Sequence, residues 1–381
     1  MQEKTKQLKF NTSIQEEEIK YFTAFSFLYC DTFFKAKLLE YFNYSAKMAF
    51  LADEKDLEGF SLHYDITVPR SFISKRNKLN VDKCFEKAFQ DKNIKIVTYN
   101  DENYPQFLKH IPDFPLALFY KGNLENIDYN YSLAVVGSRR ASTDAQNGLY
   151  KILSNFKNSN ITIVSGLAYG IDATAHKASL DNNIKTLGVI GSGLDFYYPA
   201  QNKYLYDKIV SENGAIISEY PTGTEPIARN FPMRNRIVVG MTKGTLVAEA
   251  QMKSGAMISG NLALEYNKEL MCIPGNILNP NTQGIYHLIK QGAGIVSTSE
   301  DILNIMGWEN KYKLSKNDEN EKIGELNDTQ KAIINEIALE AKSFDEIINN
   351  IELDTPSLMV NLTELELLGF IKQVNNRYYK L

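Results

Sequence analysis

The sequence predicts an α/β fold built on a largely parallel, doubly wound β-sheet in the middle of the chain. Between residues 133 and 296, short apolar runs rich in β-branched residues alternate with segments long enough to form amphipathic helices. The runs are almost continuously apolar, as expected for parallel strands that helices cover on both faces. Several lead directly into glycine-containing turns, which favours a Rossmann-like domain. The runs are LAVVG, ITIVSG, KTLGVIG, GAIISE, GTLVAEA, LMCIPG and GAGIVST.

Ahead of this region, the sequence predicts a small N-terminal helical domain and a connector within residues 1–95. Residues 14–62 place apolar and aromatic side chains at mixed three- and four-residue spacings. We expect a packed bundle, because aromatic helices of this kind pack on one another far more often than they form a binding surface. Prolines at positions 105, 112 and 115 predict turns at the start of the central domain, which we expect to span residues 96–306.

After a polar, lysine- and asparagine-rich linker at residues 307–325, residues 326–381 predict a C-terminal winged-helix-like domain. Three helical segments precede two short strands that turn at Asn375-Asn376. From Glu325 onward the chain holds ten acidic and five basic residues, and the third helical segment has no basic residue. A winged helix that reads DNA needs cations on that helix, so we expect this one to contact protein or to be structural. The helical segments are residues 328–341, 344–350 and 355–368.

The composition excludes several classes of protein. The 381 residues carry a formal net charge of −4, so any site for a polyanion must be a local patch. Cys30, Cys84 and Cys272 lie far apart, which predicts a reduced, cytoplasmic chain without a disulfide framework or a zinc site. The first residues lack the apolar run of a signal peptide, and no stretch of about eighteen apolar residues occurs, so we expect no contact with a membrane.

The loops at the carboxyl ends of the predicted strands contain most of the arginines. A doubly wound sheet binds its ligands at these loops. Two of them hold five of the eight arginines in the chain, and we expect these guanidinium groups to face solvent, where their planar forks can hold phosphate. The loop after the third run adds adjacent aromatic residues and a lysine. The five arginines are Arg139, Arg140, Arg229, Arg234 and Arg236.

Cations beside exposed rings and glycine-containing turns are typical of a site for single-stranded nucleic acid. Neither GxxxxGK[ST] nor a full GxGxxG occurs, so we predict no ATP or dinucleotide cofactor. No arrangement of nucleophile and base and no metal-ligand spacing is evident, so we predict neither a catalytic site nor a metal site. We interpret His176 as a packing residue and Asp172 as a helix cap.

Six blocks that occur in order between about residues 104 and 303 closely resemble the DNA-processing protein A family (DprA, also called Smf). The resemblance implies an extended Rossmann domain that binds single-stranded DNA without sequence preference, forms dimers and loads the RecA recombinase. It also implies a role in protecting and processing incoming DNA during natural transformation, and no enzymatic activity. The blocks are VVGSRRAS, IVSGLAYGIDATAHKASL, GVIGSGLDFYYPAQNKYL, GAIISEYPTGTEP, NFPMRNRIVVGMTKGTLVAEAQMKSGAMIS and CIPGNILNPNTQGIYHLIKQGAGIVSTSEDIL.

The resemblance also places the family's DNA pocket on particular residues and lets the two arginine clusters lie side by side at the carboxyl edge of the sheet. Arg140 and Arg229 would be neighbours of this pocket. The family's N-terminal region often carries a DNA-binding hairpin that needs glycines, and LYCDTFFKAKLL has none, so we do not expect a DNA-binding hairpin here. The expected DNA-binding residues are Gly137, Ser138, Arg139, Gly166, Phe196, Lys203, Arg234, Asn235 and Arg236.

Two alternatives remain open at this point. The stretch KGTLVAEA is similar to part of the lonely-guy phosphoribohydrolases, in which case Glu249 would be the acid/base, although VVGMTKGT stands where that family has a PGG loop. The same pocket could also serve a nucleotide-sensing module. The apolar strip AMISGNLALEY is either a dimer face or a helix that packs on the sheet, and we favour the latter.

Overall fold

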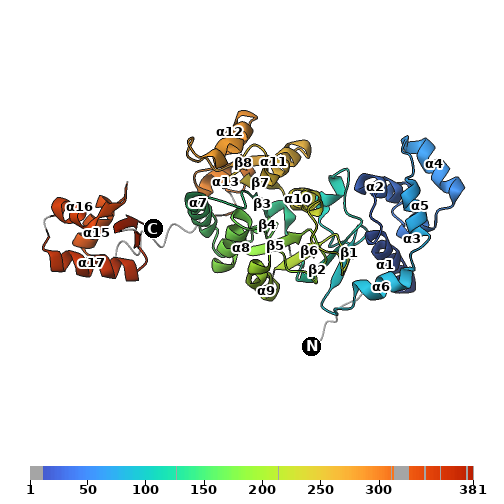
Figure 1. Cartoon of the computed structure of the whole chain (residues 1–381), viewed down its shortest axis with the longest axis horizontal. Helices are drawn as coiled ribbons and strands as arrows, with labels where there is room; N and C mark the ends of the chain where they lie inside the picture. The colour runs from blue at the N-terminus through green and yellow to red at the C-terminus, as the bar shows by residue number, and fades with distance from the viewer. Residues whose placement is uncertain are drawn as a thin grey trace. The chain divides into compact units, whose positions relative to one another are not determined.

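A computed structural model describes residues 12–381 apart from residues 126, 213, 310, 313–325, 339, 352, 375 and 381. The chain divides into two units, Met1–Leu314 and Ser315–Leu381 (Figure 1). The described residues do not include most of the predicted linker. They also do not include the start of the chain, where we expected no signal peptide. No helix within the described part of the chain is long and apolar enough to cross a membrane.

The first unit is built on a nine-stranded sheet with the order β1-β2-β6-β5-β4-β3-β7-β8-β9. Strands β3 to β9 pair parallel with one another, whereas β2 pairs antiparallel with both β1 and β6. All seven predicted runs form strands, so the predicted doubly wound sheet is confirmed. The strands are β1 (Lys95–Thr98), β2 (Ala117–Gly122), β3 (Ser132–Val136), β4 (Thr162–Ser165), β5 (Lys185–Ile190), β6 (Ala215–Ser218), β7 (Gly244–Val247), β8 (Glu269–Cys272) and β9 (Gly294–Ile295).

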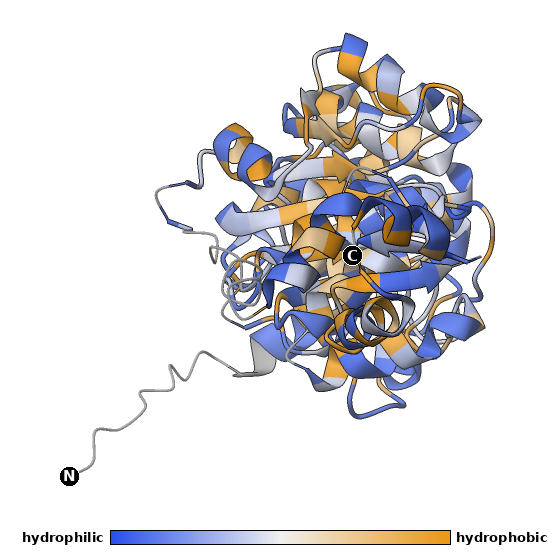
Figure 2. Ribbon diagram, turned by 90° about the vertical axis from the view of Figure 1, so that its left-hand side faces the viewer, coloured by the Kyte–Doolittle hydropathy of each residue, from blue (hydrophilic) through white to orange (hydrophobic). Residues whose placement is uncertain are grey.

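Helices cover both faces of the sheet. On one face, apolar side chains of α7, α8, α9 and α13 pack on the strands, and on the other face those of α10, α11 and α12 do so. Figure 2 shows hydrophobic and hydrophilic residues alternating along the helices, as expected of helices that bury one face. The helices are α7 (Thr143–Ser154), α8 (Ile171–Asp181), α9 (Lys203–Ser211), α10 (Asn230–Gly240), α11 (Gly255–Glu265), α12 (Gln283–Lys290) and α13 (Ser299–Met306).

The chain reverses its direction of travel across the sheet at β3. Strands β4, β5 and β6 follow β3 toward one edge, and the chain then returns to place β7, β8 and β9 on the other side of β3. Strands β3 and β7 are therefore neighbours, paired in register from Leu133↔Gly244 to Val136↔Val247. The loops that leave their carboxyl ends diverge, which creates a switch point where such sheets bind ligands.

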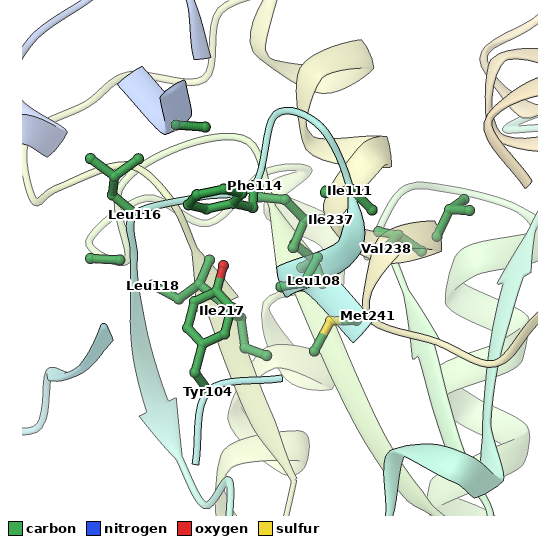
Figure 3. Packing of buried hydrophobic residues seen from close by; sticks show 14 of the residues in the cluster. Tyr104, Leu108, Ile111, Phe114, Leu116, Leu118, Ile217, Ile237, Val238 and Met241 are labelled. Carbon is green, nitrogen blue, oxygen red and sulfur yellow. The ribbon is translucent and has the colours of Figure 1, made fainter. Parts of the chain in front are cut away.

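Helix α10 is buried along most of its length. Its apolar second half, Ile237–Gly240, packs between the sheet and a cluster around the 3₁₀ segment Gln106–His110 (Figure 3). Tyr104 belongs to the same cluster, and its hydroxyl donates to the carbonyl of Pro115 at 2.6 Å. This burial on both sides of α10 determines where its arginines can lie.

The N-terminal helices form the small packed bundle that the sequence predicts. Phe72 lies between Phe25 and Phe34, with ring centroids 6.3 and 5.1 Å away, and Phe34 meets Phe60 edge to face at 5.7 Å. The aromatic core is continuous with the core on one face of the sheet, so bundle and sheet belong to one unit. The helices are α1 (Thr12–Ser26), α2 (Thr32–Tyr41), α3 (Ala46–Leu51), α4 (Glu54–Tyr64), α5 (Arg70–Arg76) and α6 (Val81–Ala88).

The second unit has the order of elements of a winged helix, as predicted. Three helices precede a hairpin whose turn residue Asn376 has a φ of 62°. A short strand between the first two helices, which the sequence reasoning missed, completes a three-stranded sheet with the order β10-β12-β11. The elements are α15 (Asp328–Glu336), β10 (Lys342–Ser343), α16 (Phe344–Asn350), α17 (Thr355–Leu367), β11 (Ile371–Val374) and β12 (Arg377–Lys380).

Candidate nucleic-acid interface

A cavity of about 1050 Å³ lies at the switch point of the sheet. Most of its wall comes from the loop after β3, the first turns of α10, and the loop and first turns between β7 and the middle of α11. We call it the switch-point cavity. The expected residues Gly137, Ser138, Arg139, Arg234 and Asn235 all line it.

The loop after β3 is held closely against its neighbours. The Ser138 backbone N–H donates to the carbonyl of Glu249 at 2.8 Å, and the Ser138 carbonyl accepts from the N–H of Ile171 at 3.2 Å. A Cβ at Gly137 would lie 2.5 Å from Cγ1 of Ile171, so a larger residue would push α8 away from this loop. Because the backbone is fixed in this way, the exposed side chains of Arg139 and Arg140 extend from a defined position at the cavity.

Arg139 and two aromatic rings form a stack at the edge of the cavity. The Arg139 guanidinium lies over the ring of Phe231 at 5.3 Å, and that ring lies 5.1 Å from the half-exposed ring of Tyr198, at an angle of 32°. Within the described residues, neither Arg139 nor Arg140 forms an ion pair with a carboxylate. The cavity therefore presents two arginines without ion-pair partners next to aromatic rings.

Arg234 lies beneath the cavity rather than in solvent. Its side chain is 4% exposed, and Nη1 donates to the carbonyl of Gly166 at 2.6 Å and to the carbonyl of Val189. These carbonyls belong to the carboxyl ends of β4 and β5. Burial lowers the pKa of Arg234 to about 10, which leaves the guanidinium charged at neutral pH. The expectation of a solvent-facing group is wrong for this arginine, because its donors hold two strands together.

Asp172 is the single acidic side chain among the described residues that line the cavity. It is buried, and its Oδ2 accepts from the backbone N–H of Ala168 at 3.3 Å. Burial raises the pKa of Asp172, against the opposing effect of the Arg234 charge. The predicted helix cap is wrong: Gly170 occupies the N-cap of α8 and Asp172 closes the preceding loop.

Arg236 lies away from the cavity. It is 2% exposed, its Nη2 lies 2.5 Å from Oε2 of Glu219, and its Nε lies 3.2 Å from Oδ2 of Asp113. Burial alone would lower its pKa, but the two carboxylates outweigh burial and raise the pKa of Arg236. The expectation of a solvent-facing guanidinium is therefore wrong here too, because both faces of α10 are covered.

The remaining expected residues lie beside the cavity. Gly166 lines a small depression that adjoins the switch-point cavity. Arg139, Tyr198 and Arg234 line both hollows. Phe196 is half-buried and lines neither hollow. Lys203 is exposed, pairs with Asp207 at 2.6 Å and lies over the ring of Tyr197 at 4.6 Å. The structure therefore brings five of the nine expected residues into the cavity itself.

Sequence reasoning missed three side chains that line the cavity. Tyr198 and Phe231 supply its rings, and exposed Lys253 adds a cation from the loop before α11. Lys253 is followed by the start of an eleven-residue helix, whose first N–H groups favour an anion. Their positions in the sequence could have indicated them, because each of the three belongs to a loop or helix start that follows a predicted strand.

Glu249, the acid/base of the enzymatic alternative, forms structural hydrogen bonds instead. The buried carboxylate of Glu249 accepts from the backbone N–H of Ser142 at 3.1 Å and from its hydroxyl at 2.7 Å, at the N-cap of α7. His176 is buried with Nδ1 2.8 Å from Oγ1 of Thr186, and burial lowers its pKa to about 3, so its predicted packing role is confirmed. Among the described residues, no group of His, Cys, Asp and Glu is arranged to hold a metal.

Comparisons with known proteins identify the family to which this chain belongs. The chain matches the family model of DNA recombination-mediator protein A over residues 95–307 and that of the DprA winged helix domain over residues 318–376. It is 39% identical over 269 residues to the DNA processing protein DprA of Streptococcus pneumoniae, a match that covers 70% of this chain and 90% of that protein.

Two solved structures are also similar to this chain. The X-ray structure of DNA processing protein A from S. pneumoniae has a TM-score of 0.62 at 35% identity and covers 72% of this chain and 95% of its own. A structure from Helicobacter pylori, described for the single-stranded DNA binding mode of its DNA processing protein A, has a TM-score of 0.50 at 27% identity, covering 55% and 94%. The resemblance seen in the sequence is thus confirmed, and the chain belongs to the DNA recombination-mediator protein A family, which includes the proteins named DprA and Smf.

Proposed function

We propose that this protein binds single-stranded DNA in the switch-point cavity, without sequence preference, and delivers it to the RecA recombinase. The observation that carries the proposal is the unpaired Arg139 guanidinium over the ring of Phe231, with the ring of Tyr198 against Phe231, beside a cavity with one buried carboxylate. Cations that track a backbone, next to rings on which bases stack, bind single strands irrespective of sequence. The H. pylori structure, which was described for its single-stranded DNA binding mode, supports the same ligand.

Within this proposal the cavity residues have different tasks. Arg139, Arg140 and Lys253 contact phosphates, because their side chains are exposed and carry no carboxylate partner. The rings of Phe231 and Tyr198 stack on bases. Gly137 and Ser138 shape the turn beside the phosphates, and Asn235 lines the wall, where its Nδ2 donates to the carbonyl of Gly255 at 3.3 Å. Arg234 supports the bound strand from below through its charge.

Three of the expected residues do not contact DNA inside the cavity in this proposal. Lys203 and Phe196 would contact DNA only where the strand leaves the cavity, since neither lines it. Arg236 stabilises α10 through Glu219 rather than contacting phosphate. We further propose that the protein acts in the cytoplasm as a homodimer on incoming DNA during transformation and has no catalytic activity. The family's name, DNA recombination-mediator protein A, supports a role on DNA in recombination.

The test is a filter-binding comparison of oligo-dT, a mixed-sequence single strand, the matching duplex and a mononucleotide. We expect similar affinity for the two single strands, weaker binding of duplex, and no competition by the mononucleotide. Equal binding of duplex and single strand contradicts the proposal, and competition by a mononucleotide favours a nucleotide sensor instead. For the RecA step, we expect the protein to accelerate assembly of RecA on single-stranded DNA covered by a single-strand-binding protein. An unchanged assembly rate rejects that part alone.

A further inference from the structure

A second arginine–ring pair lies next to the switch-point cavity, between the start of α10 and Tyr29 of the N-terminal bundle. Tyr29 follows α1, its side chain is 46% exposed, and the guanidinium of Arg229 lies over its ring at 5.8 Å. Arg229 is exposed, and its neighbour Ala228 lines the cavity. Arg229 and Phe231 are two residues apart, so their Cα atoms are at most about 7.6 Å apart. Each of the two arginine–ring pairs therefore includes a residue at the start of α10.

The bundle carries a cationic segment that adjoins this pair. Residues 70–78, which include α5, read RSFISKRNK and hold four cations and no acidic residue. Lys75 Nζ donates to the backbone carbonyl of Tyr29 at 3.0 Å, which places the segment beside the ring. Arg76 is partly buried and donates to the carbonyl of Ala52 at 2.9 Å. The side chains of Arg70, Lys75 and Lys78 are exposed, and none of the three pairs with a carboxylate in the described part of the chain.

A purely structural role at the junction of bundle and sheet explains only part of this arrangement. The Tyr29 hydroxyl does lie 3.3 Å from Oγ1 of Thr224, which links the bundle to the loop after β6. However, nearly half of the Tyr29 side chain remains exposed, and Arg229 has no carboxylate partner among the described residues. The acid nearest to Tyr29 in sequence, Asp31, accepts from the backbone N–H of Phe34 at 2.8 Å as the N-cap of α2. Neither Asp31 nor Glu225, which lies four residues before Arg229, forms an ion pair with Arg229 in the described part of the chain.

We propose that Tyr29, Arg229 and the basic segment 70–78 form a second contact region for single-stranded DNA, which continues the strand's path from the switch-point cavity onto the N-terminal bundle. The proposal rests on the function proposed above. Tyr29 supplies a face on which a base stacks, and Arg70, Lys75 and Lys78 contact the phosphates that follow. The bundle thus binds DNA through α5 and a tyrosine, without a glycine-containing hairpin.

The experiment measures affinity of the full chain for oligo-dT of two lengths, about 5 and about 20 nucleotides, because single-strand sites span about 4–16 nucleotides. Tyr29→Leu should weaken binding of the long oligonucleotide by about 5- to 150-fold, the range for one lost base stack, and leave the short one unchanged. Tyr29→Phe is the matched control: it keeps the ring, loses only the hydroxyl contact with Thr224 and should bind as the parent does.

A charge variant gives an independent measurement. Changing Arg70, Lys75 and Lys78 together to Gln should reduce the slope of log affinity against log salt by about 2 for the long oligonucleotide, or about 0.7 for each lost phosphate contact. The slope for the short oligonucleotide should not change. Unchanged long-strand binding in Tyr29→Leu, or equal weakening at both lengths with a lower melting temperature, overturns the proposal and leaves a structural junction.

The two proposals can fail separately. Arg139→Ala, in the cavity, should weaken binding at both lengths. If it weakens neither, the cavity assignment is wrong, and with it the path that leads out of the cavity. If Arg139→Ala weakens both while Tyr29→Leu changes neither, the cavity binds DNA and the extension onto the bundle is rejected.

Discussion

Arg236 and Glu219 form a buried ion pair, with Nη2 of the arginine 2.5 Å from Oε2 of the glutamate. Asp113 is the second partner of the guanidinium, and it also accepts from Thr32 of the N-terminal bundle at 3.5 Å and from Tyr266 after α11 at 3.4 Å. One arginine of α10 thereby joins the end of β6, the connector, the bundle and α11. This pair stabilises the elements that form the switch-point cavity without reaching the cavity.

We therefore expect Arg236→Ala to destabilise the protein. Removing one partner of a buried pair leaves the other charge buried and uncompensated, which costs about 3–5 kcal/mol of unfolding free energy. Urea unfolding measures this loss, with Arg140→Ala as the control, because Arg140 is exposed and unpaired. A variant that keeps its stability but binds single strands with a lower salt dependence would show that Arg236 contacts phosphate after all.

Arg139 should behave in the opposite way. We expect Arg139→Ala to keep its melting temperature, to bind all single-stranded sequences more weakly, and to lower the salt slope by up to about 0.7. Arg139→Lys separates charge from stacking: it should keep the salt slope yet lose affinity, because an ammonium does not lie flat on Phe231 as a guanidinium does. Filter binding at several salt concentrations measures both. An unchanged slope in Arg139→Ala contradicts the assigned phosphate contact.

Strands β3 to β9 of the central sheet could be predicted because each lies in a short apolar run with β-branched residues. Strands β1 and β2 of the same sheet could not be predicted, because they lie in a connector interrupted by prolines. Tyr104 and the segment Gln106–His110 pack in the same connector. The short strand β10 has two residues and no apolar pattern of its own. The order of elements in the winged helix could be predicted because helix caps and a hairpin turn depend on residues that are close together in the sequence.

The sequence shows where the arginines cluster, but it does not show which guanidinium groups reach solvent. Arg229, Arg234 and Arg236 lie within one short stretch, yet only Arg229 is exposed. The usual inference from helix faces fails here because the sheet covers one side of α10 and the connector covers the other. The ring that lines the cavity is Tyr198 rather than the expected Phe196, since three adjacent rings follow β5 and only tertiary packing distinguishes them.

Gly166 offers a test of the cavity floor. A Cβ at this position would contact the Arg234 guanidinium and lie 2.6 Å from Oδ2 of Asp172. We expect Gly166→Ala to lower the unfolding free energy by about 1–3 kcal/mol, the usual cost of overpacking, and to weaken single-strand binding as Arg234 shifts. Gly255→Ala is the matched control on the same cavity, because nothing lies within 4 Å of its added Cβ. Equal stability and affinity in both variants would show that Arg234 has room to move.

His176 should make stability depend on pH. Burial, with a smaller contribution from the Arg234 charge, lowers the pKa of His176 to about 3, whereas the unfolded value is about 6.5. Between these values the unfolded chain binds a proton that the folded chain does not bind. The unfolding free energy therefore falls as pH falls through this window, by up to about 1.4 kcal/mol per pH unit. Urea unfolding of the parent and of His176→Gln, at several pH values between about 6.5 and 4.5, measures the difference in slope. His176→Gln should depend less steeply on pH whatever its stability at pH 7, because it has no imidazole to protonate on unfolding. Parallel slopes would mean that the folded protein accommodates the imidazolium beside Thr186.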